Sequence, residues 1–271
     1  MSDFHRGAGA TRIGGAAERT PAVVDAGLRA YMLHIYNYMV LGLAITGFAA
    51  LGIYMLSVTG DAASAARSAT GATVALKNGQ FLTPLGYALF VSWLKWAVIL
   101  APLALVFAIS FGIERLRPAM AQMLFWLFAA LIGVSLASIF LVYTQTSIVR
   151  VFFITAASFG ALSLWGYTTQ RDLTGMGSFL IMGLFGIIIA SVVNLFMANG
   201  VMGFIISVVG VLVFAGLTAW DTQRLKNDYI YGYAAQGGDV AERAAITGAL
   251  SLYLNFINLF TLLLQLLGQR D

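Results

Sequence analysis

Long apolar runs alternate with short polar segments along most of the chain. A helix needs roughly 20 apolar residues to cross ~30 Å of hydrocarbon, and seven runs approach or exceed this length. They cover residues 31–58, 87–113, 119–143, 148–167, 177–198, 201–220 and 245–268. The strands of an outer-membrane barrel would instead show alternation over segments of about ten residues. The pattern predicts an all-α integral membrane protein, with a seven-helix transmembrane domain over residues 31–271.

The segments outside these runs are polar or rich in small residues. Residues 1–30 carry four arginines and few bulky apolar side chains, so we expect a mobile polar tail. Residues 59–80 read as a plain outer loop. The second run holds Lys95 beside Trp96, which predicts an interfacial first part and a crossing that starts near Trp96, kinked at Pro102.

The composition agrees with a membrane protein and excludes several other classes. Hydrophobic residues make up 60% of the chain and charged residues only 10%, which no water-soluble domain of this length shows. Cysteine is absent, so disulfides and thiolate metal sites are excluded. The net charge of +4 suits contact with a lipid bilayer, and we expect no nucleic-acid partner.

The distribution of lysine and arginine predicts the orientation, because cytoplasmic segments carry the excess of these residues. With the N-terminus inside, ten of them lie on the cytoplasmic side, namely Arg6, Arg12, Arg19, Arg29, Arg115, Arg117, Arg171, Arg224, Lys226 and Arg243. Five lie on the other side, namely Arg67, Lys77, Lys95, Arg150 and Arg270. We therefore expect a cytoplasmic N-terminus.

The last run carries a stripe of polar side chains along one helix face. Its members recur every three or four residues, at Thr247, Ser251, Asn255, Asn258, Thr261 and Gln265. Lipid offers these groups no hydrogen bonds, so the stripe should face other helices or a wet cavity. Interhelical hydrogen bonds and a polar pathway both remain open as explanations.

One carboxylate stands where the sixth run turns polar. Asp221 lies within GLTAWDTQRLKNDY (216–229), directly after the uncharged run that ends at residue 220. An ionised carboxylate inside hydrocarbon is costly, so an acid at this depth favours a functional role. The alternative is a boundary residue that points into water or pairs with Arg224 one turn further on. Spacing alone leaves both interpretations open.

Three sequence segments resemble a known family. The pair FAGLTAWDTQRLK (214–226) and GALSLYLNFINLFTLLLQLLG (248–268) resembles the transmembrane Bax-inhibitor-motif family. FWLFAALIGVSLASIFLVYT (125–144) is similar to the bacterial members of that family. The resemblance extends over nearly everything from Tyr31 onward, and it implies a bacterial inner (plasma) membrane protein.

The resemblance also implies a fold and a function. It implies a central C-terminal helix surrounded by six others, and a pH-sensitive calcium leak channel. In this family two aspartates, one in each C-terminal motif, latch the cytoplasmic end of the pore, and Asp221 matches the first. A family arginine near the end of the second span contacts the pair, and Arg115 or Arg117 corresponds to it here.

This chain departs from the family pattern at the second aspartate. The family usually reads LYLDFINLF, whereas this chain reads LYLNFINLF, with Asn255 at that place. Two close carboxylates resist ionising together, but an aspartate beside a neutral amide has no such repulsion. We therefore expect Asp221 to stay ionised at neutral pH and to accept a hydrogen bond from Asn255. The pH response should be weaker than in relatives with both acids, or displaced to lower pH.

The expected ion pathway and gate consist of Asp221, Asn255, Asn258, Ser251 and Arg115. Hard cations bind best through several oxygens, and the spans supply one carboxylate, so Asp221 predicts only a weak calcium site. Calcium or another cation is thus expected as a permeant ion and not as a tightly bound metal.

We expect no enzyme and no cofactor. His5 and His34 have no nucleophile motif nearby, one membrane acid cannot form an aspartyl dyad, and nucleotide-binding fingerprints are absent from the sequence. Two other functions remain open. A proton-coupled secondary transporter would also use a membrane carboxylate and a polar stripe. A non-conducting regulator or scaffold would bind other membrane proteins.

Overall fold

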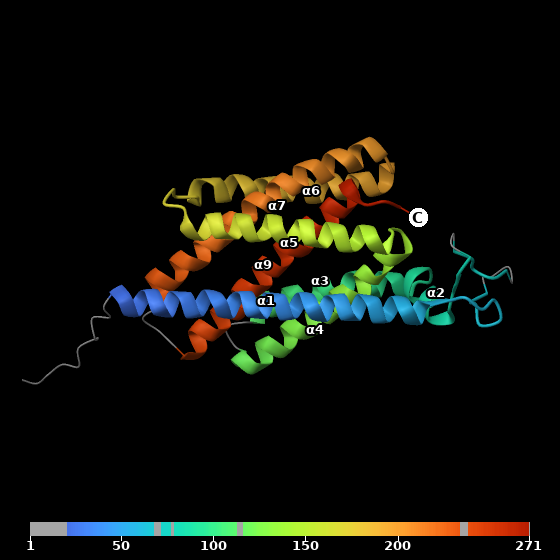
Figure 1. Cartoon of the computed structure of the whole chain (residues 1–271), viewed down its shortest axis with the longest axis horizontal. Helices are drawn as coiled ribbons and strands as arrows, with labels where there is room; N and C mark the ends of the chain where they lie inside the picture. Colours follow the sequence, from blue (N-terminus) through green and yellow to red (C-terminus); the bar gives the residue numbers. More distant parts are fainter. Residues whose placement is uncertain (1–20, 68–71, 77–78, 113–115, 234–237, 271) are drawn as a thin grey trace, which may run out of the picture.

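The computed structural model describes residues 21–67, 72–76, 79–112, 116–233 and 238–270. Within these residues seven helices are long and apolar enough to cross a membrane, which confirms the predicted all-α membrane fold. The helices run along the long axis of an elongated bundle (Figure 1). α1 (Pro21–Ser57) begins at the left end in this view, and α9 (Gly238–Leu267) ends near the C-terminus at the right end.

The remaining spans follow one another up and down the bundle. They are α3 (Leu94–Gly112), α4 (Pro118–Leu136), α5 (Gln145–Thr168), α6 (Thr174–Met197) and α7 (Gly200–Asp228). A 3-10 turn, η1 (Ala137–Leu141), extends α4, and a π-helical turn, η2 (Tyr229–Tyr233), extends α7. Side-chain caps start two of these helices, because Thr144 Oγ1 accepts from Ser147 N and Asn199 Oδ1 accepts from Val201 N.

Several helices extend beyond the apolar runs that predicted them. α1 begins at Pro21, so the helix starts ten residues before the predicted membrane domain, and the boundary at residue 30 stays a prediction. Residues 1–20 lie outside the described part of the chain. α7 continues past residue 220 to Asp228, and α9 starts at Gly238 instead of residue 245. Hydropathy marks the depth of the bilayer, whereas a helix continues into polar turns as long as its backbone bonds are made.

The second run and the loop before it are more structured than predicted. A short helix, α2 (Pro84–Phe90), precedes a turn, and the crossing helix α3 starts at Leu94, close to the expected Trp96, with Pro102 inside it. The two ends of the predicted plain loop are joined by a small antiparallel pair, β1 (Val58–Thr59) with β2 (Phe81–Leu82).

α9 is the most buried of the seven spans. Its most apolar window is 56% buried, against 11–28% in the other six spans. It packs against α1, α4, α5 and α7, while α3 packs mainly on α4 and α6 mainly on α7. A helix that is buried on several sides must be apolar nearly all round, which is true of α9 outside its polar stripe. The expectation of six helices around one stays a prediction in that detail.

The outer faces of the bundle carry large apolar side chains. Phe48, Phe111 and Phe196 are each more than three-quarters exposed. Such a surface would aggregate in water, but it is compatible with hydrocarbon. The exposed residues therefore mark the lipid-facing side of each span.

Candidate functional site: a buried carboxylate between α7 and α9

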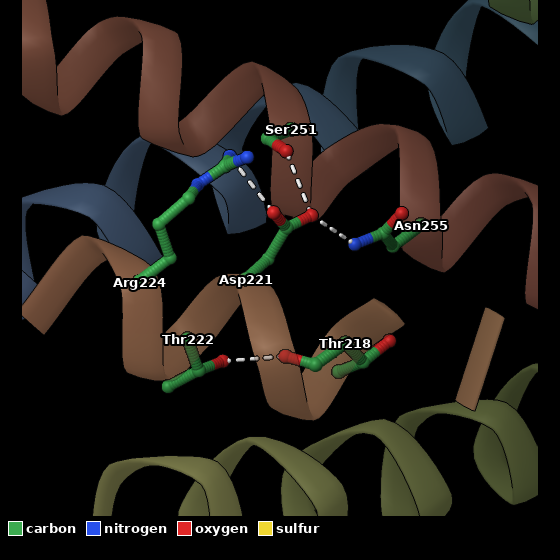
Figure 2. A network of polar contacts seen from close by, with 6 residues as sticks. All are labelled: Thr218, Asp221, Thr222, Arg224, Ser251 and Asn255. Atoms are coloured by element: carbon green, nitrogen blue, oxygen red, sulfur yellow. Dashed lines mark hydrogen bonds and ion pairs between the residues drawn. The ribbon is translucent and has the colours of Figure 1, made fainter. Parts of the chain in front are cut away.

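Asp221 lies at the contact between α7 and α9, and its side chain is buried. Only 4% of the residue is exposed. Its Oδ2 accepts hydrogen bonds from two α9 side chains, Ser251 Oγ at 2.8 Å and Asn255 Nδ2 at 2.7 Å (Figure 2). Ser251 and Asn255 stand one helical turn apart, so both face the same carboxylate oxygen. The last two spans are thus joined through one acidic group.

A guanidinium group contacts the other carboxylate oxygen. Arg224 Nη2 lies 2.8 Å from Asp221 Oδ1, three residues further along α7 (Figure 2). The Arg224 side chain is 40% exposed and packs over the Trp220 ring, 4.7 Å from its centroid. The sequence left two alternatives for Asp221, a place inside the bundle or an ion pair with Arg224. In the structure Asp221 is buried and also pairs with Arg224.

The charge of Asp221 is compensated unequally on its two oxygens. Oδ2 has two donors, whereas Oδ1 has no aligned hydrogen bond among the described residues and only the Arg224 contact. Because Arg224 is partly in water, this ion pair is screened and worth less than a fully buried one. The two neutral donors of α9 are the groups that replace water around the charge.

Asn255 has the orientation that a carboxylate partner requires. Its amide nitrogen, and not its oxygen, faces Asp221, since an oxygen there would repel the charge. An aspartate at this position would do the same only if it carried a proton. Asn255 is 6% exposed and therefore reproduces the geometry of a protonated acid without the titratable proton.

The structure divides the polar stripe of α9 into two groups. Ser251, Asn255 and Gln265 bond to α7, the last by accepting from Ser207 Oγ at 2.8 Å. Thr247, Asn258 and Thr261 donate instead to backbone carbonyls of α9 itself. Asn258 donates to the Leu254 carbonyl and does not contact Asp221 in this structure. Interhelical bonding therefore accounts for half of the stripe.

The arginine that the resemblance implies near the end of the second span is untested at Arg115. Arg115 lies outside the described residues. Arg117 is exposed at the start of α4 and makes no side-chain capping bond. The cation at Asp221 is Arg224, from the same helix.

A second polar network on the other side of α7 was missed from the sequence. Tyr36 of α1 bonds to Ser163 of α5, and the Ser163 hydroxyl lies 2.9 Å from Thr222 Oγ1. Thr222 in turn donates to the Thr218 carbonyl at 2.8 Å (Figure 2). Thr222 is the neighbour of Asp221, so this network ties α1 and α5 to the turn that carries the carboxylate.

Gln223 holds the loop between α5 and α6 against the same turn of α7. Its Nε2 donates to the Arg171 carbonyl and its Oε1 accepts from Leu173 N, both at 2.8 Å. The residue is only 6% exposed. The motif TAWDTQRLK thus places polar side chains all around one helix, a feature that a search for a single polar face does not detect.

A polar cavity of about 390 Å³ lies near the carboxylate, between the first part of α1, the end of α7 and the first turns of α9. It includes Arg224, so it reaches the guanidinium that pairs with Asp221. Tyr31 also lines it, stacked on Tyr229, and its buried hydroxyl has no hydrogen-bond partner within the described part of the chain. The other polar lining residues are Asp228, Arg243, Thr247 and Tyr233. We call this cavity the vestibule.

The described residues hold no cluster of three acidic, histidine or cysteine side chains that would bind a metal ion. One carboxylate with two neutral donors and a guanidinium is a poor ligand set for a hard cation. The geometry suits a charged contact between two helices better than a resident metal.

A family model described as "Inhibitor of apoptosis-promoting Bax1" matches residues 28–271, which include the whole described bundle from α1 onward except its first turns. The chain belongs to the Bax inhibitor family. The resemblance noted in the three segments is thereby confirmed, and this membrane protein shares its family with proteins from several bacteria.

Two relatives align along almost their whole length. An uncharacterized protein of Caulobacter vibrioides is 43% identical over 99% of this chain and 98% of its own. The inner membrane protein YbhL of Escherichia coli is 42% identical over 93% of this chain and 97% of its own. This likeness covers the spans as well as the loops, and so it supports one membrane domain of the same kind.

Proposed function

We propose that this protein is a passive cation leak of the bacterial inner membrane, with calcium as a permeant ion, gated at Asp221. The N-terminal end of the bundle is taken as cytoplasmic, as the lysine and arginine count predicts. The proposal rests above all on the 2.7 Å contact between Asn255 Nδ2 and Asp221 Oδ2, because it links α7 to α9 through a buried charge.

The vestibule provides the cytoplasmic approach in this proposal. Its volume of about 390 Å³ is enough for several water molecules, each of which occupies about 30 Å³ in the liquid. A hydrated cation that enters it meets Asp228 first and then the Arg224–Asp221 pair. Movement of Arg224 away from Asp221 would expose an anion to the entering ion, which is what a latch at this place must do.

The opposite half of the contact between α7 and α9 is closed by apolar packing. A Cβ atom added to Gly210 would lie 2.7 Å from Leu262 Cδ1, so the two helices approach closely there. A conducting state therefore requires α7 and α9 to separate, and the Asp221 contact opposes this separation. In this proposal, the arrangement in which Asp221 is bonded to α9 is the closed state.

Calcium would pass this site without binding tightly. Asp221 is its one carboxylate, and Ser251 and Asn255 face it with hydrogen-bond donors, so the site offers an ion few oxygen ligands. Fast passage needs weak sites, whereas a cage of six to eight oxygens would trap the ion. A proton switch of two acids is absent because Asn255 replaces the second one, so the proposed leak responds weakly to pH or only at low pH.

The test is calcium flux into liposomes that contain the purified protein, measured from pH 5 to pH 8 for the wild type and for Asp221→Asn. We expect Asp221→Asn to abolish the pH dependence of flux and to change its size by about tenfold or more, because the substitution removes both the charged contact that opposes opening and the anion that an entering ion would meet. A contact worth ~1.4 kcal/mol corresponds to a tenfold effect. Asp172→Asn, which removes an exposed acid outside the bundle, is the matched control and should leave flux unchanged.

Three results would contradict the proposal. Flux that is identical in wild type and Asp221→Asn at every pH would remove Asp221 from the pathway. Uptake against a calcium gradient that collapses with the proton gradient would identify a carrier instead. Absence of flux from the pure protein, together with a stoichiometric membrane-protein partner, would identify a regulator.

A further inference from the structure

A long groove runs along the outside of the bundle between α1 and α5. Both helices pack on α9, but they make few contacts with each other. The groove has a volume of about 810 Å³ and is lined almost entirely by apolar atoms. In Figure 1, α9 crosses behind the space between α1 and α5, and Phe256 of α9 lines the groove. The groove is open toward the side where lipid would lie.

The groove is long enough to hold an acyl chain of one leaflet. On α1 its lining extends from Arg29 to Ala44, which is about 22 Å of helix at 1.5 Å per residue. One leaflet contributes about half of the ~30 Å hydrocarbon thickness. A second apolar cavity of about 280 Å³ shares Leu43, Phe152 and Phe256 with the groove and continues it along α1 toward Ala50.

Two hydroxyl groups in the wall of the groove are already paired. Tyr36 and Ser163 both line it, but their hydroxyls bond to each other, and Ser163 also bonds to Thr222. An apolar occupant therefore leaves neither of these hydroxyls unsatisfied. A buried hydroxyl without a partner would cost about 1–3 kcal/mol. A polar ligand would find few free partners along these walls.

Positive charge gathers at the end of the groove where α1 begins. Arg29 is exposed and forms part of the lining. Lys226 of α7 lies beside it through Tyr167, a lining residue whose carbonyl accepts from Lys226 Nζ at 2.8 Å. Basic residues at the mouth of a site between helices attract anionic lipid headgroups.

We propose that this groove is a binding site for one anionic phospholipid. An acyl chain lies between α1 and α5 on Phe159 and Phe256, and the phosphate group lies at Arg29. The lipid fills the space that the two helices leave over α9. Through Tyr36 and Ser163 its chain contacts the network that ends beside Asp221, so the site is in contact with the turn that carries the carboxylate.

A glycine in the groove offers a clean way to block it. Gly160 lines the groove, and a Cβ atom added there would meet nothing within 4 Å. Gly160→Phe would thus fill the groove from one wall without a backbone clash. Gly186 of α6 is also exposed with open space before it, but lies away from the groove, so Gly186→Phe is the matched control.

The experiment is native mass spectrometry of the full chain, released from vesicles of phosphatidylglycerol or of phosphatidylcholine. We expect wild type and Gly186→Phe to retain one phosphatidylglycerol, and Gly160→Phe to retain at least about tenfold less, the factor that ~1.4 kcal/mol provides. Arg29→Gln, an exposed change that leaves the groove open, should remove the preference for phosphatidylglycerol over phosphatidylcholine.

Equal lipid retention by Gly160→Phe and wild type would overturn the proposal. A wild-type dimer that Gly160→Phe converts to a monomer, with no change in bound lipid, would assign the groove to a second copy of the chain and overturn it as well. An unchanged lipid preference in Arg29→Gln would overturn the placement of the headgroup. Lipid retention and oligomeric state are measured without ion flux, so a failure of the lipid site can be distinguished from a failure of the proposed leak.

Discussion

The contact between α7 and α9 changes character along its length. In the half near Asp221 the helices are joined by a charge and its donors. In the far half they are joined mainly by shape, with Gly210 against Leu262, and by one neutral hydrogen bond from Ser207 to Gln265. Apolar packing and neutral hydrogen bonds do not depend on pH, whereas a carboxylate contact does. Any switch between these helices must therefore act in the charged half.

The largest expected effect comes from adding a second acid to the charged half. Asn255→Asp would place two carboxyl groups in direct contact, and such a pair shares a proton because both cannot ionise easily. We expect the pH of half-maximal calcium flux to rise by about 1–3 pH units relative to the wild type. Liposome flux between pH 4 and pH 9 measures this shift.

Asn258→Asp is the control for this change. Asn258 is on the same stripe but bonds only to the Leu254 carbonyl, so an acid there does not meet Asp221 directly. Its flux profile should differ from that of Asn255→Asp. If Asn255→Asp titrates identically to the wild type, the charged half is not where pH acts.

The next largest effect is on the free energy of unfolding. It comes from a substitution that removes one of the hydrogen-bond donors to Asp221. Asn255→Leu leaves Asp221 Oδ2 with Ser251 as its one interhelical donor, and we expect a loss of about 2–3 kcal/mol, typical of hydrogen bonds to charged groups. Asn258→Leu removes only a bond within α9 and should cost less than about 1 kcal/mol. Denaturant unfolding in detergent measures the two losses in unfolding free energy. Equal losses would show that the hydrogen bond to Asp221 stabilises the protein no more than a bond within α9.

The sequence predicted the membrane fold well because hydrophobic length has a direct physical meaning. Seven runs gave seven spans, with α3 starting at Leu94, close to the predicted Trp96. Helix ends were predicted less well, as with Pro21 and Asp228, because polar turns continue a helix without adding hydropathy. The β1–β2 pair was missed because two-residue strands leave no periodic pattern.

The site was only partly predictable. Asp221 was found because a charge after a long apolar run is costly, and Asn255 because it recurs on one face with Ser251. Asn258 was grouped with Asp221 and Asn255 only because of its helical spacing. Spacing places a residue on a helix face, but it does not show whether the side chain bonds to another helix or to its own backbone, as Asn258 does. The Tyr36–Ser163–Thr222 network joins three helices far apart in sequence, and no local pattern encodes such contacts.

A smaller effect on stability is expected when a glycine is replaced by alanine in each half of the contact between α7 and α9. Gly166 of α5 packs against the turn of α7 that carries Asp221. A Cβ atom at Gly166 would overlap the Ala219 carbonyl of α7. Backbone cannot move aside easily, so we expect Gly166→Ala to cost about 1–3 kcal/mol. In Gly210→Ala the obstacle is the end of the flexible Leu262 side chain, so the loss should be smaller. Thermal unfolding in detergent ranks the two, and a larger loss in Gly210→Ala would mean that the apolar half is the more rigid one.

The smallest effect concerns an acid outside the contact between α7 and α9. Asp172 accepts from Thr174 Oγ1 at 2.6 Å and from Thr174 N at 2.9 Å, and these hydrogen bonds, the side-chain one first, lower the pKa of Asp172 below its usual value. Because the folded pKa lies below the unfolded one, the ionised form stabilises the fold at neutral pH. This contribution is lost as the pH falls through the folded pKa.

Asp172→Asn cannot ionise and should therefore show a slightly lower thermal midpoint at pH 7 and a flatter decline below about pH 4. The side chain is in water, so the difference should be small compared with that of Asn255→Leu. Calorimetry at pH 7, 5 and 3.5 measures it. An acid of the same type thus has a minor effect on a solvated loop and a major one between α7 and α9. If Asp172→Asn changed the flux profile as strongly as Asn255→Asp, the difference between the two halves of the contact would no longer account for gating.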